Sequence, residues 1–239
     1  MKERELRAIN MVDLTIIRSS AEMDIIRPLV PDANLKLFPL LLSIPGTQKK
    51  FNQRKDILFI GGFQHTPNID AVKFFVSEIM PLLRKKLPGV CFHVVGSKPT
   101  VEIIGLKAED VIITGYVKNI ASLLDKFKVS VAPLRFGAGV KGKIGTAMAA
   151  GLPVVATSLA LEGMSLTPEV NILLADSKEE TIDAITRIYL DEELWSSISK
   201  EGLVFASQTW GAEAAWDVMA DILTRLNLTF KATSKSQVF

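Results

Sequence analysis

The sequence contains a single cysteine, Cys91, among 239 residues. One cysteine excludes both a disulfide framework and a cysteine-based zinc site. Cys91 lies in the apolar run VCFHVV, which favours a buried strand residue over a nucleophile. The sequence also has little net charge, since 28 basic and 26 acidic residues leave +2. Its lysines are scattered and form no basic stripe. We therefore expect no nucleic-acid partner, whereas a phosphate-bearing small molecule is compatible with this composition.

Long apolar runs are absent as well. The most apolar tract, residues 147–161, is interrupted by Gly151 and Pro153 and is shorter than the ~20 residues of a membrane-spanning helix. Residues 1–14 are charged and lack the apolar centre of a secretory signal. We therefore expect a cytoplasmic protein with no transmembrane segment, for which peripheral contact with a membrane remains possible.

From residue 57 onward, short apolar runs alternate with helical patterns. The runs predicted as strands are residues 57–61, 91–96, 111–115, 129–134, 153–157 and 171–176. They are apolar on both faces, as strands are when helices cover each side of a parallel sheet. The sequence therefore predicts an α/β fold with a doubly wound parallel sheet.

The helices between these strands have their own signals. Asn68 is expected to cap the helix that follows it, and Pro81 is expected to kink or split that helix. Residues 119–127 place their apolar side chains, including Phe127, on one helical stripe. Ser177 and Glu180 form a capping box before another helix.

The start of the sequence differs from the middle. Residues 12–17 and 34–40 are predicted to be short strands around a capped helix at 19–29, and a pattern of about 45 residues is too small for a core of its own. We expect residues 1–46 to be the remnant of the end of a preceding domain. A linker at 47–56 would follow it.

The main domain is expected to span residues 57–228. After the last predicted strand, apolar residues at helical spacing predict two closing helices with no further strand. Residues 229–239 are polar and are expected to fray.

Ligands of an open parallel sheet bind where strands end and loops enter helices. In the loop GGFQHTPN, paired glycines including Gly62 allow close backbone approach or positive φ, and His65 either contacts a ligand or only fixes the loop. His93, within a strand pattern, is interpreted as a core residue. The loop GYVKN, residues 115–119, could offer backbone groups to a base edge, which is a weak signal alone.

A third loop, residues 137–145, carries four glycines before a helix. Free amides at the start of that helix can take a diphosphate, assisted by Lys141 or Lys143. The sequence has neither G-x-G-x-x-G after the first strand nor G-x-x-x-x-G-K-[ST]. Phosphate binding here is thus one interpretation, and an ordinary glycine turn is the other.

Several ordered motifs together resemble one family. They are PLRFGAGVKGKIGTAMAAGLPVVATSLALEGM, the upstream ILFIGGFQHTPNIDAVKFFVSEIMPLL, and GYVKNIASLLDKFKVSVAPL between them. This pattern is similar to the nucleotide-sugar-binding C-terminal half of GT-B glycosyltransferases of the group 1 (GT4-like) retaining family. The resemblance covers residues 13–226, and its start is similar to the end of the family's amino-terminal domain.

The resemblance implies two facing Rossmann-like domains. The second would hold a nucleoside diphosphate sugar, and the first would hold a saccharide or lipid-linked acceptor. It implies no cofactor and no metal, because helix amides and cations offset the charge of the leaving diphosphate. The contacts implied for diphosphate and sugar fall on Gly139, Lys141, Gly142 and Lys143, and those for the base fall on Tyr116 and Val117.

The sequence departs from the family pattern in two places. The family commonly has two glutamates eight positions apart, of which the second grips the ribose hydroxyls and the first faces the donor sugar. Thr146 and Ala138 occupy these positions here, so Thr146 predicts weaker donor binding. The first loop also lacks the arginine and lysine seen in many members, and its His65, with Asn68 and Asp70, matches a subgroup instead.

Three functions remain open at this stage. The first is an enzyme that transfers a sugar from a nucleotide donor. The second is a donor-binding domain or a degenerate remnant without turnover of its own, favoured for a lone chain because transfer needs both domains around the anomeric carbon. A partner chain that supplies the acceptor domain would favour the first. The third, another nucleotide-binding α/β domain, lacks the expected phosphate loop. No catalytic residue is assigned.

Overall fold

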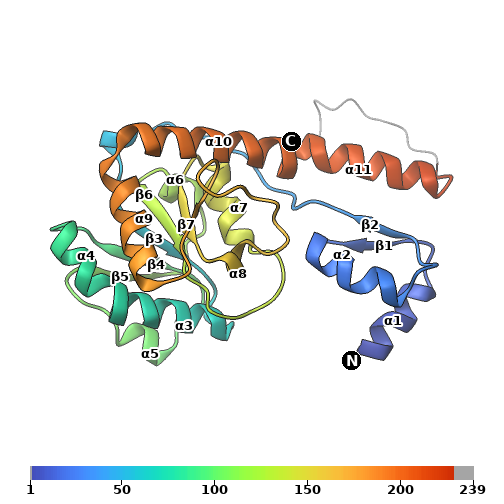
Figure 1. Cartoon of the computed structure of the whole chain (residues 1–239), viewed down its shortest axis with the longest axis horizontal. Coiled ribbons are helices and arrows are strands. Elements are labelled where there is room, and N and C mark those ends of the chain that lie inside the picture. Colours follow the sequence, from blue (N-terminus) through green and yellow to red (C-terminus); the bar gives the residue numbers. More distant parts are fainter. Residues whose placement is uncertain (1, 229–239) are drawn as a thin grey trace.

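The computed structural model describes residues 2–228, and its largest part is a six-stranded parallel sheet with the strand order β5-β4-β3-β6-β7-β8 (Figure 1). The strands are β3 (Lys55–Ile60), β4 (Phe92–Val95), β5 (Val111–Gly115), β6 (Phe127–Ala132), β7 (Val154–Ala156) and β8 (Leu173–Leu174). All six predicted strands are confirmed. The residues of β6 are buried throughout, as a central strand covered on both faces requires.

The strand order reverses between β3 and β6. From β3 the chain proceeds outward to β4 and β5, and from β6 it proceeds outward in the other direction to β7 and β8. Ile57 of β3 pairs with Phe92 on one side and with Val129 on the other. This is the doubly wound topology predicted from the sequence, and its switch point lies between the loops that follow β3 and β6.

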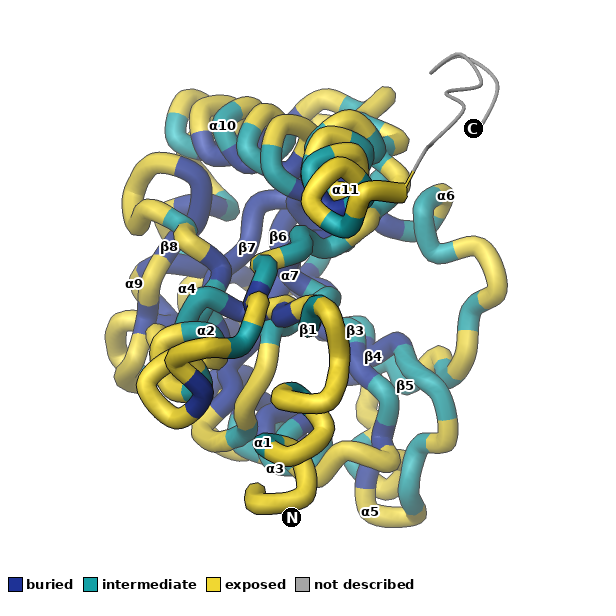
Figure 2. Tube along the Cα trace, turned by 90° about the vertical axis from the view of Figure 1, so that its right-hand side faces the viewer, coloured by how far each residue is buried: buried dark blue, intermediate teal, exposed yellow. Residues whose placement is uncertain are grey.

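Helices cover both faces of the sheet. Helix α3 (Thr66–Phe74) leads into α4 (Met80–Lys86), which packs with α9 (Lys178–Leu190), whereas α7 (Gly142–Ala149) packs with α10 (Glu192–Trp210) on the opposite face. The short helices are α5 (Val101–Ile104), α6 (Ala121–Leu124) and α8 (Ser158–Leu161). Figure 2 shows the buried strands β6 and β7 behind the more exposed helices.

Pro81 splits its helix as predicted. A π-helical segment, Phe75–Ile79, joins α3 to α4, and Pro81 lies in the first turn of α4. Proline has no N–H to donate, so the wider π turn before it accommodates the missing bond. The capping box of Ser177 and Glu180 at the start of α9 is also confirmed.

Two local predictions were wrong. Helix α3 begins at Thr66, with His65 as the capping position, so Asn68 lies inside the helix rather than before it. Pro67 explains the early start, because its fixed φ suits a first helical turn. Phe127 belongs to β6, not to the stripe of α6, since that helix ends at Leu124 and Asp125 turns toward the linker.

Residues 2–37 form a small α/β unit beside the main sheet. It contains α1 (Lys2–Asn10), β1 (Thr15–Ile17), α2 (Ser20–Ile26), a 3-10 turn at Arg27–Leu29, and β2 (Leu35–Leu37). The two strands pair in parallel, and Ile17, Val30 and Leu35 form a core separate from the main one. The predicted strands and helix here are confirmed, whereas the domain boundaries stay a prediction.

The small unit is held against the main body at several points. Lys36 of β2 pairs with Asp221 of α11 (Ala212–Arg225), which extends beyond α10 above the unit (Figure 1). The chain between β2 and β3 is fixed at Leu42, whose amide donates to the carbonyl of Trp210 over 2.9 Å. It continues through a 3-10 turn, Phe51–Gln53, into β3. Helices α10 and α11 are the two closing helices predicted.

Within the described residues, no helix is both long enough and apolar enough to cross a membrane. The tail at 229–239, predicted to fray, lies outside the described residues.

Candidate functional site

Glycines draw the ends of three neighbouring strands together. The amide of Gly61 donates to the carbonyl of Val95 over 2.9 Å, and the amide of Gly96 donates to that of Gly115 over 2.9 Å. A Cβ atom on Gly96 would lie 1.7 Å from the carbonyl oxygen of Gly61. No side chain fits there, so the carboxyl ends of these three strands present closely packed backbone at the site.

The loop after β3 uses its glycines for close approach. Neither Gly61 nor Gly62 has positive φ. A Cβ on Gly61 would lie 2.8 Å from the Cγ atom of Asn68, whose side-chain amide donates to the carbonyl of Gly62 over 2.7 Å. Asn68 therefore fixes this loop. His65 lies at the start of α3, where its side chain makes no capping bond and is exposed.

The glycine-rich loop after β6 requires left-handed backbone. Gly137 has φ +113° and Gly139 has φ +81°, both in the region that glycine adopts most readily. Nζ of Lys141 donates to the carbonyl of Gly137 over 3.2 Å and to that of Gly139 over 2.5 Å. Burial lowers the pKa of Lys141, and the nearby charge of Glu162 partly offsets this. The loop is thus ordered around its own lysine.

Gly145 has a different role from the other glycines of this segment. It lies inside α7, and a Cβ there would be 2.7 Å from Leu42 and 3.2 Å from the ring of Trp210. It is a packing glycine that lets Leu42 and Trp210 of α10 contact α7. The prediction that it belongs to the loop before the helix was wrong.

Lys143 connects the two loops of the switch point. Its Nζ donates to the side-chain oxygen of Asn68 and lies 4.4 Å from the ring centroid of Phe59. Burial, with the neighbouring positive charge of Lys141, lowers the pKa of Lys143 to about 7. An anion beside it would favour the charged form. Lys141 and the protonated form of Lys143 therefore provide cationic groups at the start of α7.

A second link between these loops involves two residues whose pairing the sequence did not predict. Nε of Arg135, in the loop after β6, donates to Asp70 of α3 over 2.8 Å. The guanidinium also lies 4.8 Å from the ring centroid of Phe74. Their separation of 65 residues explains why no sequence pattern indicated this pair.

Thr146 faces a cavity of about 160 Å³. Its hydroxyl donates to the carbonyl of Gly142 in its own helix over 2.9 Å. Besides Thr146 and Ser43, the described residues around this cavity have no polar side chain; they are Leu42, Pro45, Ile120, Ala121 and Leu124. The cavity therefore lies between α7 and the segment that follows β5.

The residues predicted to contact the base lie just after β5. Tyr116 is 72% exposed, and Val117 packs against the main core. Because β5 is the outermost strand on its side, they lie farther from the switch point than the loops after β3 and β6. The structure therefore brings together Gly62, Asn68, Lys141 and Lys143. It places Tyr116 and Val117, the residues predicted to contact the base, at the outer strand of the sheet.

The start of α7 can bind an anion. The first amides of a helix lack partners within it, and the helix dipole favours negative charge there. With Lys141 and Lys143 alongside, this arrangement suits a phosphate or diphosphate. Among the described residues, no group of three or more His, Cys, Asp or Glu side chains could hold a metal ion.

Comparison with solved structures shows the same fold in glycosyltransferases. S. aureus TarM, in a mutant complexed with fondaparinux, α-GlcNAc-glycerol and UDP, matches with TM-score 0.78 and 19% identity over 92% of this chain and 46% of that one. Sucrose-phosphate synthase from Thermosynechococcus elongatus matches with TM-score 0.70 and 18% identity over 93% and 60%. Anabaena HepE, complexed with UDP-glucose, matches with TM-score 0.72 and 15% identity over 94% and 68%.

The sequence itself matches a family model, described as "Glycosyl transferases group 1", over residues 54–191. No curated protein matches the chain. The model covers more than half of the chain, which therefore belongs to the group 1 glycosyltransferases, with the fold of the GT-B class. The chain spans about half the length of TarM.

Proposed function

We propose that this chain binds a nucleoside diphosphate sugar at the switch point between β3 and β6. The observation that carries the proposal is the arrangement around Lys143, which joins Asn68 of α3 to the start of α7 with Lys141 nearby. Two loops and two cations converge there on a helix start, as a diphosphate requires. UDP in the complexes of TarM and HepE, which share this fold, supports a nucleotide ligand.

Within this proposal the chain takes part in sugar transfer with retention of configuration. The bond between the anomeric carbon and the diphosphate oxygen breaks, and a bond to an acceptor hydroxyl forms on the same face. The hydroxyl proton passes to the departing diphosphate. Helix amides, Lys141 and Lys143 would stabilise the negative charge that develops on the diphosphate. The acceptor is a saccharide or a lipid-linked molecule, and a partner chain would supply further acceptor-binding surface.

Calorimetric titration of the chain with UDP, GDP and their glucose conjugates tests the donor site. We expect micromolar binding of one base series, weakened at least tenfold in Lys141→Ala and unchanged in Lys107→Ala, an exposed lysine remote from the site. Absence of binding at millimolar concentration, or equal losses in both variants, would refute the proposal.

Turnover is tested separately from binding. Anomeric NMR signals of sugar released from the donor show whether the chain breaks the donor bond and with what stereochemistry. Release of the retained anomer supports the enzyme. Donor binding without release would favour the second candidate, a non-catalytic donor-binding domain. Weak or absent donor binding would favour a degenerate remnant, in line with Thr146, which is expected to weaken donor binding.

A further inference from the structure

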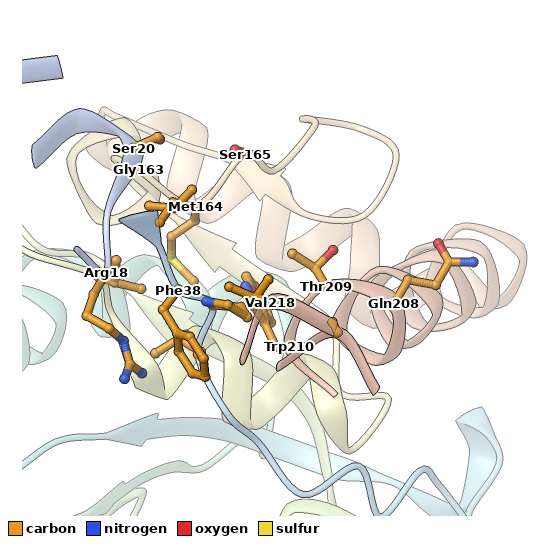
Figure 3. A pocket seen from close by; sticks show the side chains of 15 residues that line it. Arg18, Ser20, Phe38, Gly163, Met164, Ser165, Gln208, Thr209, Trp210 and Val218 are labelled. Atoms are coloured by element: carbon orange, nitrogen blue, oxygen red, sulfur yellow. The ribbon is translucent and has the colours of Figure 1, made fainter. Parts of the chain in front are cut away.

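A second cavity, of about 350 Å³, lies between the small unit and the main body. Segments from both parts surround it: the ends of β1 and β2, the glycine-rich loop, the loop after α8, and helices α10 and α11. Figure 3 shows Arg18 and Phe38 beside each other, and Trp210 and Val218 together across from them.

The two parts are fixed relative to each other at this cavity. Gly163, which lines it, has φ +72°, and a Cβ there would lie 2.1 Å from the hydroxyl oxygen of Ser19. Ser19 is buried and caps α2, with its hydroxyl accepting from the amide of Glu22 over 3.4 Å. The backbone of Gly163 thus touches the residue next to Arg18, which makes this a packed junction.

Arg18 alone is charged among the described residues that line the cavity. It follows β1 directly and is exposed to solvent. Within residues 2–228, no carboxylate forms an ion pair with Arg18. A guanidinium without a carboxylate partner is available to bind an anion through its fixed fork of donors.

The remaining surface of the cavity is mainly apolar. Phe38 and Trp210 contribute aromatic rings, and Val140 and Met164 contribute aliphatic and thioether groups. Hydroxyl and amide groups are supplied by Ser20, Ser165, Thr209 and Gln208. Such a surface suits the apolar face of a sugar ring or an alkyl chain, with a few polar groups that set its orientation.

The cavity adjoins the proposed donor site. Val140, one of its lining residues, lies between Gly139 and Lys141 of the glycine-rich loop. Another lining residue, Gly163, follows Glu162, whose charge acts on Lys141. A ligand in the cavity would therefore contact the same loop that is proposed to hold the donor diphosphate.

We propose that this cavity binds an acceptor that carries a phosphate group on a saccharide or alkyl body, and that Arg18 selects for that phosphate. Its role as an acceptor site rests on the function proposed above, whereas the binding of a phosphate-bearing ligand does not. Arg18 would provide bidentate contacts to the phosphate, and Phe38 and Trp210 would contact the body of the ligand.

Titration with three probes tests this inference: hexyl phosphate, glucose 1-phosphate, and the uncharged hexyl glucoside. At least one phosphate probe should bind, at least tenfold more tightly than hexyl glucoside. Arg18→Gln should weaken that binding at least tenfold. Arg27→Gln, an exposed arginine of the same unit outside the cavity, should leave it within twofold. Preference between the phosphate probes distinguishes a lipid from a sugar source, and both support the proposal.

Three results would overturn it: no binding of either phosphate probe at millimolar concentration, equal binding of hexyl glucoside, or equal effects of the two substitutions. UDP titrated into the same samples separates the two proposals. If UDP binds and the phosphate probes do not, only this inference fails. If UDP does not bind while a phosphate probe binds through Arg18, the phosphate site stands and its role as an acceptor site fails.

Discussion

The ammonium of Lys143 donates a hydrogen bond to the side-chain oxygen of Asn68, 75 residues earlier in the chain. This bond joins the helix after β6 to the helix after β3, across the point where the strand order reverses. The same Asn68 holds the carbonyl of Gly62. One asparagine thus positions both the first loop and a cation of the proposed donor site.

Donor affinity is expected to fall as pH rises. The pKa of Lys143 is lowered to about 7 by burial and by Lys141, so the free chain loses this charge above neutral pH. A bound diphosphate favours the charged form, and binding above pH 7 therefore takes up a proton. We expect the affinity for UDP-glucose, measured by calorimetry, to be about tenfold lower at pH 8 than at pH 6.

Lys143→Arg is the matched control, because arginine stays charged across this range. In that variant the affinity should not change with pH. Equal affinities at pH 6 and pH 8 in the unmodified chain would show that Lys143 does not face the diphosphate.

Lys141→Ala should discriminate between parts of the donor. Lys141 lies at the start of α7, so its loss should weaken UDP at least tenfold but leave uridine nearly unchanged. Titrations with both ligands measure the difference. Losses of equal size would remove Lys141 from the phosphate role.

Thr146→Glu should tighten donor binding. The family resemblance places a ribose-binding carboxylate at this position, whereas the hydroxyl of Thr146 already bonds to Gly142. Hydrogen bonds to a charged group contribute about 1.5–3 kcal/mol each, so a gain of tenfold or more in UDP affinity is expected. In Thr146→Gln the new side chain is as long as glutamate but neutral, so the gain in UDP affinity should be smaller. Unchanged affinity in both variants would place the ribose elsewhere.

Gly163→Ala should destabilise the contact between the small unit and the main body. Both the positive φ of +72° and the 2.1 Å approach to Ser19 oppose a methyl group. Gly46 has φ +64°, and no atom lies within 4 Å of the position that its Cβ would take, so Gly46→Ala isolates the backbone cost of about 1–2 kcal/mol. Thermal denaturation should show a clearly larger loss for Gly163→Ala. Equal losses of thermal stability in the two variants would mean that Ser19 moves away from an added methyl group at little cost.

Asp125→Ala should weaken the attachment of the linker to the sheet. Asp125 pairs with Arg54 over 2.6 Å, and the Arg54 side chain is 0% exposed. Removing the partner of a buried charge costs about 3–5 kcal/mol of unfolding free energy. The exposed pair of Arg84 and Asp110 is the comparison, and Asp110→Ala should cost about 0–1 kcal/mol. Denaturant titration measures both, and similar costs would contradict the account.

The sequence was sufficient to predict the sheet because its strands are apolar on both faces. Each of the six predicted runs overlaps a strand from β3 to β8. The positions of Asn68 and Phe127 were wrong for opposite reasons. Pro67 starts its helix early, and Asp125 ends its helix early because it bonds to the linker.

The contacts that build the candidate site were harder to predict. Lys143 and Asn68 were each noted in the sequence, but their bond depends on the sheet topology. The pairing of Arg135 with Asp70 likewise joins distant segments. Gly145 resembles a loop glycine in the sequence, and only the packing of Trp210 reveals its role. Side-chain pairing across the fold has no local sequence signal.

A crystal structure of the chain with UDP tests the central claim most directly. We predict that the diphosphate binds at the start of α7, within hydrogen-bond distance of Nζ of Lys141 or Lys143, and faces the loop at Gly62. A diphosphate bound away from the switch point between β3 and β6 would contradict it.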